Sequence, residues 1–457
     1  MEEIPEEAHG SKDAVPGTAP SAAAAAGLHA QEGGAVVRRS NHRHTGSFKG
    51  HASLEEEQMT DGQVEQLRLQ LEEQMQMSES ADTPEESETA GGDTGGFKFD
   101  SPEHKEQLKR QRAELWQWLK HVGSNMFKQG INLTKISLPV CLFEPRSFLE
   151  RVTQNWEYQG LLIAAANCTD PADRLRYVVA FACSGLCRQV SFHKPFNPIL
   201  GETYQATYAN GVEVYCEQIS HHPPVSSWQV YEPAGKFVFY GNGNWVAGIK
   251  GNSVKGRQTG TNCIHFGSDG ANVSYELPGL TVKGVLWGER VLKYGGEMVF
   301  QDDKNGLTCE LTIDAQAPPK SFLSGWFGRA KSSSLPPVKP DMIKGVLKQG
   351  DTVLDSCSGN WLTHFEWEKG LSAAAAPVSG GKGGKTSTLR LWDIRTSPLS
   401  PAIAVPAALP SDCRHRQDLV HLKAGDQAAS QEWKLKLEEA QRADRKLRKE
   451  GGGFVEH

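Results

Sequence analysis

The chain has 457 residues, with 49 Lys and Arg against 55 Asp and Glu, and therefore a formal net charge of −6. Its nine cysteines are scattered without a Cys-x-x-Cys pair, which argues against a disulfide framework or a zinc ribbon and favours reduced thiols. No apolar run approaches the length of a membrane span, and the first residues lack the basic and apolar regions of a signal peptide.

The charge is unevenly distributed along the chain. Residues 1–100 hold 20 acidic and 7 basic side chains and very few aromatics, which leaves a net charge of +7 for the remainder. Low hydrophobicity combined with high net charge does not repay the entropy lost on folding. We therefore expect residues 1–100 to form a disordered acidic tail, in which 55–77 could form a short helix, and residues 101–450 to form one domain.

The first part of this domain has helical spacing. Apolar residues share one stripe between His104 and Val122. A second helical stretch is expected from Pro145 to Ala166. A third is expected over Ala172–Leu186, because an aspartate followed by a proline is a typical helix start.

After residue 190, short alternating runs separated by turn residues predict strands. Many short strands joined by tight turns favour a mainly β domain with flanking helices, whose antiparallel sheet is closed or nearly closed into a barrel. A barrel with this many strands has room for a ligand in its interior. The expected strands are Thr203–Tyr208, Val212–Cys216, Phe237–Tyr240, Asn272–Leu277, Leu280–Leu286, Glu297–Phe300, Leu307–Ile313 and Val346–Leu354.

The chain closes with an amphipathic helix, expected over about Ala429–Glu450 and ended by glycines from Gly451 onward. We expect this helix to dock on the domain through an apolar face that consists of Trp433, Leu437 and Ala440. Residues 373–385 and 451–457 have the composition of flexible segments.

The segment Glu217-Gln218-Ile219-Ser220-His221-His222-Pro223-Pro224 has an unusual composition for a strand end. Proline has no N–H for a sheet ladder, so the two prolines stop the strand and leave a rigid corner. The corner presents His221 and His222, whose imidazoles donate hydrogen bonds and carry charge near neutral pH, as a phosphate requires. An ordinary turn with solvent-facing histidines is the alternative.

Other chemistry at this corner is less well supported by the sequence. A zinc site needs further ligands at a workable spacing, and none is compelling. Hydrolysis needs a nucleophile beside a histidine that can move as a proton shuttle, and the prolines hinder such motion. We therefore expect no metal, no other cofactor and no catalytic residue.

Two further segments contain candidate anion ligands. In Lys194-Pro195-Phe196-Asn197-Pro198-Ile199-Leu200-Gly201-Glu202, the prolines and the glycine fix a loop from which Lys194 and Asn197 project. Lys434, Glu438 and Arg442 are spaced by four and therefore share one helix face. The alternatives are a surface loop and a solvated row of ion pairs.

These segments occur in the same order as in the ligand-binding domain of the oxysterol-binding-protein-related family, which they resemble. The likeness covers roughly residues 110–450 and includes Ser137-Leu138-Pro139-Val140 and Glu144-Pro145-Arg146-Ser147-Phe148-Leu149. It implies an incomplete, many-stranded antiparallel barrel around a hydrophobic tunnel that an N-terminal lid closes. The implied lid lies near residues 116–133 and includes Trp116, Leu119, Met126, Phe127, Ile131 and Leu133.

The resemblance also implies ligands. Family members typically bind phosphatidylinositol 4-phosphate, and many exchange it for sterol or phosphatidylserine; the sequence does not distinguish these second lipids. Glu438 would orient Lys434, and Asn197 would contact the inositol ring. The implied 4-phosphate ligands are Lys194, His221, His222, Lys434 and Arg442.

The implied protein is cytosolic, associates peripherally with anionic membrane surfaces, binds no nucleic acid and has no pleckstrin-like module before the domain. Phe97-Lys98-Phe99, after an acidic stretch, resembles a motif that docks some lipid transfer proteins on the endoplasmic reticulum, so an adaptor there could be a partner of the tail. An ordinary linker is the alternative. The alternative functions are a lipid sensor or scaffold without bulk transfer, and a histidine-dependent phosphoesterase.

Overall fold

The residues that the computed structural model describes lie within a unit that spans residues 55–457. Side chains are not described at 119–122, 131–132 and 249–250. The predicted helix at 55–77, the segment 373–385 and residues 452–457 lie outside the described residues. Those described are 95–122, 131–132, 137–221, 223–250, 252–313, 340–369, 371 and 388–451.

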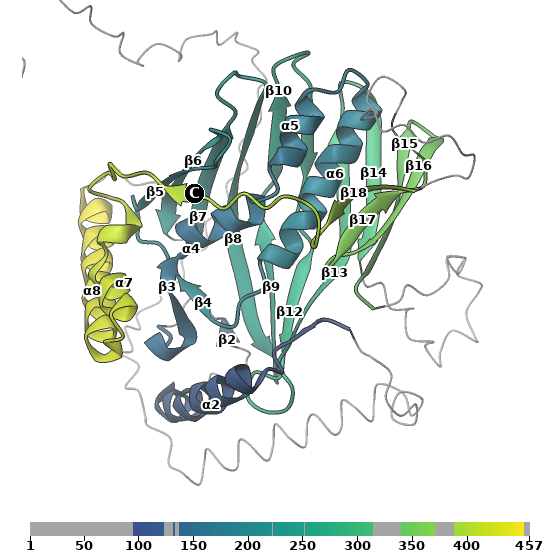
Figure 1. Cartoon of the computed structure of the whole chain (residues 1–457). Helices are drawn as coiled ribbons and strands as arrows, with labels where there is room; N and C mark the ends of the chain where they lie inside the picture. The colour runs from purple at the N-terminus through teal and green to yellow at the C-terminus, as the bar shows by residue number, and fades with distance from the viewer. Residues whose placement is uncertain are drawn as a thin grey trace, which may run out of the picture. The chain divides into compact units, whose positions relative to one another are not determined.

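A sheet of 17 strands forms the body of the described part (Figure 1). The strands are β1 (Phe97–Lys98), β2 (Ile131–Asn132), β5 (Thr203–Thr207), β6 (Glu213–His221), β7 (Pro224–Tyr231), β8 (Phe237–Lys250), β9 (Ser253–Thr259), β10 (Asn262–Phe266), β11 (Asn272–Tyr275), β12 (Gly279–Lys283), β13 (Val291–Asp302), β14 (Leu307–Ile313), β15 (Met342–Gln349), β16 (Thr352–Asn360), β17 (His364–Trp367), β18 (Leu389–Asp393) and β19 (Ile403–Ala404).

Helices and a small second sheet complete the described part. A parallel pair is formed by β3 (Phe143–Ser147) and β4 (Lys194–Phe196). The helices are α2 (Pro102–Val122), η1 (Val140–Leu142), α4 (Phe148–Val152), η2 (Thr153–Trp156), α5 (Gly160–Ala166), α6 (Pro171–Arg188), η3 (Cys413–His415), α7 (Gln417–Lys423) and α8 (Gln427–Glu450).

Two long strands give the large sheet its curvature. The first part of β8 pairs with β7 and β10, whereas its second part pairs with β9. In the same way β13 pairs first with β12 and then with β14. All pairings are antiparallel, and the sheet does not close, since within the described strands β18 pairs with β17 and β19 with β5. The prediction of a mainly β, incompletely closed architecture is therefore confirmed.

Helix α6 fills the concave side of the sheet. Figure 1 shows α5 and α6 lying across the strands, and α6 buries residues on all its faces from Asp173 to Leu186. Its start matches the expectation, because the Asp170 side chain accepts a hydrogen bond from the N–H of Ala172 and Pro171 occupies the first turn. None of the described helices combines the length and the apolar character that crossing a bilayer requires.

A small cavity of about 20 Å³ separates α6 from the sheet, and is lined by Phe181 and Gly185 on the helix and by Trp228 and Tyr275 on the strands. This volume holds about one water molecule. Pockets that hold drug-sized ligands measure roughly 300–1,000 Å³. This cavity is therefore too small to hold a drug-sized ligand.

Two expected elements were wrong in their boundaries. The stretch from Pro145 to Ala166 begins as strand β3 and becomes helical only after Ser147, whose side chain caps α4. The single strand expected at Val346–Leu354 is the hairpin of β15 and β16, with Gly350 at φ 54° in the turn. A two-residue turn within an alternating run is indicated only by a residue, such as glycine, that favours the backbone conformation of the turn.

The domain also begins earlier than the expected residue 101. Strand β1 pairs Phe97 with Leu292 of β13, and Phe99 is 4 % exposed and packs edge-on against Phe192. The segment is therefore part of the fold, and the linker interpretation of Phe97–Phe99 was wrong. Phe99 is buried and Phe97 half-buried, and docking of an adaptor there stays a prediction.

Gly345 in β15 lies in close contact with the neighbouring strand β14. A Cβ atom there would lie 2.3 Å from Leu311 Cδ2 and 2.4 Å from the Glu310 carbonyl oxygen. We expect Gly345→Ala to lower the free energy of unfolding by about 1–3 kcal/mol, because overpacking displaces the neighbouring strand. The matched control is Gly295→Ala, where the nearest atom would be 3.8 Å away. Equal urea midpoints for the two variants would contradict this packing.

Candidate anion-binding site

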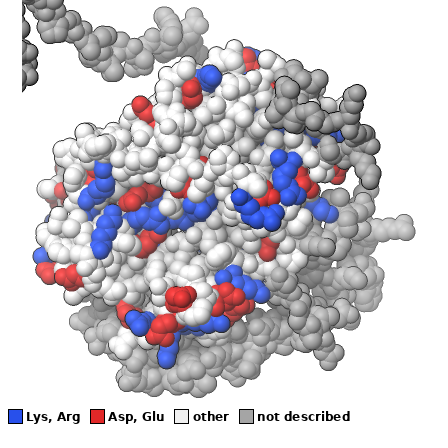
Figure 2. Space-filling view, viewed as in Figure 1, with Lys and Arg blue, Asp and Glu red and all other residues white. Residues whose placement is uncertain are grey.

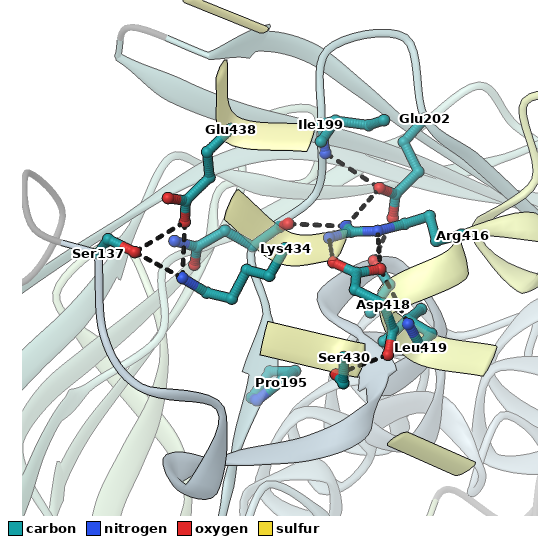
Figure 3. A network of polar contacts seen from close by, with 12 residues as sticks. Ser137, Pro195, Ile199, Glu202, Arg416, Asp418, Leu419, Ser430, Lys434 and Glu438 are labelled. Carbon is teal, nitrogen blue, oxygen red and sulfur yellow. Dashed lines mark hydrogen bonds and ion pairs between the residues drawn. The ribbon is translucent and has the colours of Figure 1, made fainter. Parts of the chain in front are cut away.

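Three distant segments meet beside the parallel pair β3–β4. Phe143 of β3 pairs with Lys194 of β4, which places the lysine next to an aromatic ring. The loop after β4 is fixed to β6, because the N–H of Gly201 donates to the Gln218 carbonyl at 2.9 Å. Helix α8 packs on α7 and approaches η1, and it brings Lys434 to the same place (Figure 3).

Lys194 is held by neutral groups. Its Nζ donates to the Pro195 carbonyl at 3.1 Å and to Asn197 Oδ1 at 2.5 Å. The side chain as a whole is half-buried, but its ammonium end is surrounded by protein, and this burial, together with the charges of Lys434 and Arg416, lowers the pKa of Lys194 to about 7. Near neutral pH, therefore, a substantial fraction of this amine is uncharged.

Lys434 is held by an acid and a hydroxyl. It is 5 % exposed, and its Nζ donates to Glu438 Oε1 and to Ser137 Oγ, both at 2.7 Å. Ser137 Oγ in turn donates to Glu438 Oε1 at 3.2 Å, which closes a triangle (Figure 3). The predicted role of Glu438 in orienting Lys434 is supported by this geometry, while Ser137 was not foreseen as a contact.

Arg416 supports the loop that bears Asn197, and the sequence analysis missed it. Arg416 is 8 % exposed. Its guanidinium donates to Glu202 Oε2 at 2.7 Å, to the Asn197 carbonyl at 2.8 Å and to Asp418 Oδ2 at 2.7 Å. Glu202 also accepts from the N–H of Ile199 at 3.0 Å and from the Ser147 hydroxyl. The network ties β3, the Asn197 loop and the start of α7 together (Figure 3). A lone arginine beside an aspartate carries no recognisable motif, so only the fold reveals this contact.

The histidine corner is a tight hairpin. Strand β6 continues to His221, which pairs with Pro224 at the start of β7. The expectation that the prolines simply end a strand at Cys216 was therefore wrong; they form the turn between two paired strands. Gln218, three residues before His221, bonds to Gly201 and Glu202, so the hairpin and the Lys194 loop lie at the same end of β6. His222 lies outside the described residues.

The remaining predicted residues lie in different parts of the structure. Asn197 is exposed and contacts Lys194, and Arg442 is exposed one turn beyond Glu438 on α8. Of the proposed lid residues, Trp116 packs against the cluster that contains Leu115, Val285 and Leu286. Leu119 lies in α2 and Ile131 in β2, with no description of their side chains; Met126, Phe127 and Leu133 fall among the residues without a described placement.

Helix α8 docks through a polar face, which corrects the expected apolar one. Its buried residues are Ser430 and Lys434, whereas Trp433 and Leu437 are half-buried and Ala440 is exposed. Ser430 donates to the Asp418 carbonyl at 2.7 Å, and the N–H of Val140 donates to Gln431 Oε1 at 2.9 Å. Hydrogen bonds, rather than apolar area alone, place this helix.

The charge balance shows what these side chains can bind. Lys434 has Glu438, and Arg416 has Glu202 and Asp418; in the described part of the chain, by contrast, no carboxylate pairs with Lys194. A buried ammonium without an acid is stabilised by an anion such as a phosphate through charge-assisted hydrogen bonds. On the face that Figure 2 displays, basic and acidic side chains are interspersed.

Comparison with known proteins places this arrangement in context. A family model described as "Oxysterol-binding protein" matches residues 114–456. The chain is 36 % identical over 370 residues to oxysterol-binding protein 9 of Dictyostelium discoideum, covering 77 % of this chain and 79 % of that protein.

Solved structures share the fold. The Osh1 ORD domain in complex with cholesterol matches with a TM-score of 0.59 and 25 % identity, over 73 % of this chain and 81 % of that one. The Osh3 ORD of Saccharomyces cerevisiae, solved in complex with PI(4)P, matches with a TM-score of 0.52 and 21 % identity, over 71 % and 82 %. The latter likeness concerns the fold.

Proposed function

Because the chain belongs to the oxysterol-binding protein family, we propose that it is a lipid transfer protein that binds phosphatidylinositol 4-phosphate and exchanges it for a second lipid between membranes. The observation that carries the proposal is the enclosed pair Lys194 and Lys434, of which Lys194 has no acid partner among the described residues. A phosphate monoester carries nearly two negative charges at neutral pH, and it would supply the missing partner.

Each predicted ligand then has a distinct task. Lys194 and Lys434 donate to the 4-phosphate, and Glu438 with Ser137 holds Lys434 in position. Asn197, at the exposed side of Lys194, contacts the inositol ring. The histidine hairpin and Arg442 close the site around the phosphate. We propose binding without catalysis, since His221 is held in a strand pair with Pro224.

The second lipid occupies the side of the sheet that faces α6 in this proposal. A related domain has been solved with cholesterol, which supports sterol as a candidate; phosphatidylserine is the other. The small cavity between α6 and the sheet would widen when the lipid enters. We further propose that the protein is cytosolic and meets anionic membranes peripherally, because extraction of a lipid requires contact with the bilayer.

The test is lipid extraction from liposomes that contain phosphatidylinositol 4-phosphate or phosphatidylinositol. The wild-type protein should extract the phosphorylated lipid preferentially. The double variant His221→Ala, His222→Ala should lose at least about 10-fold of this activity, as expected when charge-assisted hydrogen bonds are removed. His265→Ala, a strand histidine bonded to Asn272, is the matched control.

Undiminished extraction by the folded double variant would contradict the proposal that the histidine hairpin binds the phosphate. Transfer between liposomes that is far slower than extraction would favour a lipid sensor over a transfer protein. Release of inorganic phosphate would show a phosphoesterase instead.

A further inference from the structure

Two aromatic rings in tilted contact lie beneath three cations at this site. Phe143 and Phe196 are 6 % and 1 % exposed, and their ring centroids are 4.7 Å apart. The Phe143 centroid lies 4.9 Å from Lys194 Nζ and 5.6 Å from Lys434 Nζ. Arg416 Cζ lies 5.6 Å from the centroid of Phe196. The rings thus connect three positive charges that come from β4, α7 and α8.

An aromatic ring and a carboxylate stabilise a cation in different ways. The negative face of the aromatic quadrupole attracts an ammonium within about 6 Å of the centroid, but the ring carries no net charge. A carboxylate in the same place would neutralise the ammonium and would repel an incoming phosphate. An aromatic ring therefore holds like charges close together and leaves their charge available to a ligand.

We infer that Phe143 is a positioning residue, whose ring holds the ammonium groups of Lys194 and Lys434 together for a phosphate dianion. The inference rests on the proposed function for the identity of the ligand, whereas the ring–ammonium contacts are observed in the structure. Phe143 itself contributes no hydrogen bond from its side chain and acts through the two lysines.

The charged groups around Lys194 determine how the affinity of the site for a phosphate depends on pH. Burial, then the charges of Lys434 and Arg416, oppose the protonation of Lys194. The acids of the same elements pair with other cations, Glu438 with Lys434 and both Glu202 and Asp418 with Arg416. The ring of Phe143 favours the charged amine. Further ionisable side chains on the elements that form the site are His193 before β4, His221 at the end of β6 and Arg442 on α8.

The sign of the pH effect follows from the protonation state of Lys194. With a pKa of about 7 in the free protein, Lys194 is increasingly neutral above pH 7, and a phosphate that requires the ammonium must bind together with a proton. Phosphoinositide affinity should therefore fall as the pH rises from 7 to 8.5. A weaker quadrupole on the Phe143 ring lowers the pKa of Lys194 further. The loss of affinity that this change causes should therefore be larger at pH 8 than at pH 6.5.

Site-specific fluorination of Phe143 tests the inference while preserving the shape of the ring. Incorporation of 4-fluoro- and then 3,4,5-trifluorophenylalanine weakens the quadrupole in steps. The titration of Lys194 in the ligand-free protein is followed by NMR of lysine labelled with ¹³C at Cε, with Lys194→Arg for assignment. Phe300 is the control, since it is fully buried and stacks on Tyr275 at 4.9 Å.

Fluorination at Phe143 should lower the pKa of Lys194 stepwise and reduce affinity for a short-chain phosphatidylinositol 4-phosphate by about 2- to 5-fold, the range of a partly exposed cation–π contact. Fluorination at Phe300 should change neither. An unmoved Lys194 titration, or equal shifts from both positions, would overturn the inference. If wild type binds no phosphoinositide, the proposed function fails, and the ligand-free titration still decides the role of Phe143.

Discussion

Replacement of Arg416 by Met is expected to lower the free energy of unfolding by about 3–5 kcal/mol, the cost of removing one partner from a buried ion pair. The guanidinium bonds two carboxylates, Glu202 and Asp418, which are 2 % and 0 % exposed. Methionine fills a similar volume but leaves both acids without their cation. Denaturant unfolding monitored by tryptophan fluorescence gives the measurement.

The loss of unfolding free energy in Arg416→Met should become smaller at low pH. The two acids in the variant are buried without a cation, so they bind protons more readily, and the difference between variant and wild type should narrow as the pH falls towards 4. Arg390→Met is the matched control, because Arg390 also contacts two acids, Glu366 and Asp393, but is 45 % exposed. It should cost about 0–1 kcal/mol. Equal losses for both arginines would contradict the supporting role of Arg416.

Replacement of Lys434 by Met should reduce affinity for phosphatidylinositol 4-phosphate by about 10- to 100-fold, because one charge-assisted hydrogen bond to the phosphate contributes about 1.5–3 kcal/mol. Lys436→Met is the matched control on the same helix. Lys436 pairs with Glu432 at 2.6 Å and is 52 % exposed, whereas Lys434 is enclosed. Isothermal titration with a short-chain lipid measures both variants.

Two results would separate the possible explanations of a loss at Lys434. If the thermal midpoint of Lys434→Met is unchanged while affinity falls, the lysine acts on the ligand. If the Lys436 variant loses as much affinity, the effect belongs to the net charge of α8 rather than to the enclosed ammonium.

The parts of the fold with regular periodicity could be predicted from the sequence. The alternating run at Leu307–Ile313 is strand β14, the run at Thr203–Tyr208 contains strand β5 (Thr203–Thr207), and the capped start of α6 lies at Asp170. Turns inside continuous patterns could not be predicted in the same way. The hairpin turn at Gly350 interrupts one alternating run. At His221–Pro224 the prolines were expected to end a strand, but this segment is the turn of a hairpin between two paired strands.

The candidate site was predictable where its residues are concentrated in short motifs. Lys194, Asn197, Lys434 and Glu438 follow from such motifs, and the structure brings them together. Phe143, Ser137 and Arg416 were not predictable, because each acts through contacts more than 40 residues away in the chain. The buried face of α8 was missed for a related reason: a buried lysine is unexpected until its acid and hydroxyl partners are seen.

Native mass spectrometry of the wild-type protein tests the central claim most directly. The protein is incubated with liposomes that contain equal amounts of phosphatidylinositol 4-phosphate and phosphatidylinositol, and is then separated from them. The proposed phosphate site predicts a one-to-one complex with the mass of the phosphorylated lipid, which Lys434→Met should form to a much smaller extent. Equal loading of the two lipids, or unchanged loading of the variant, would contradict it.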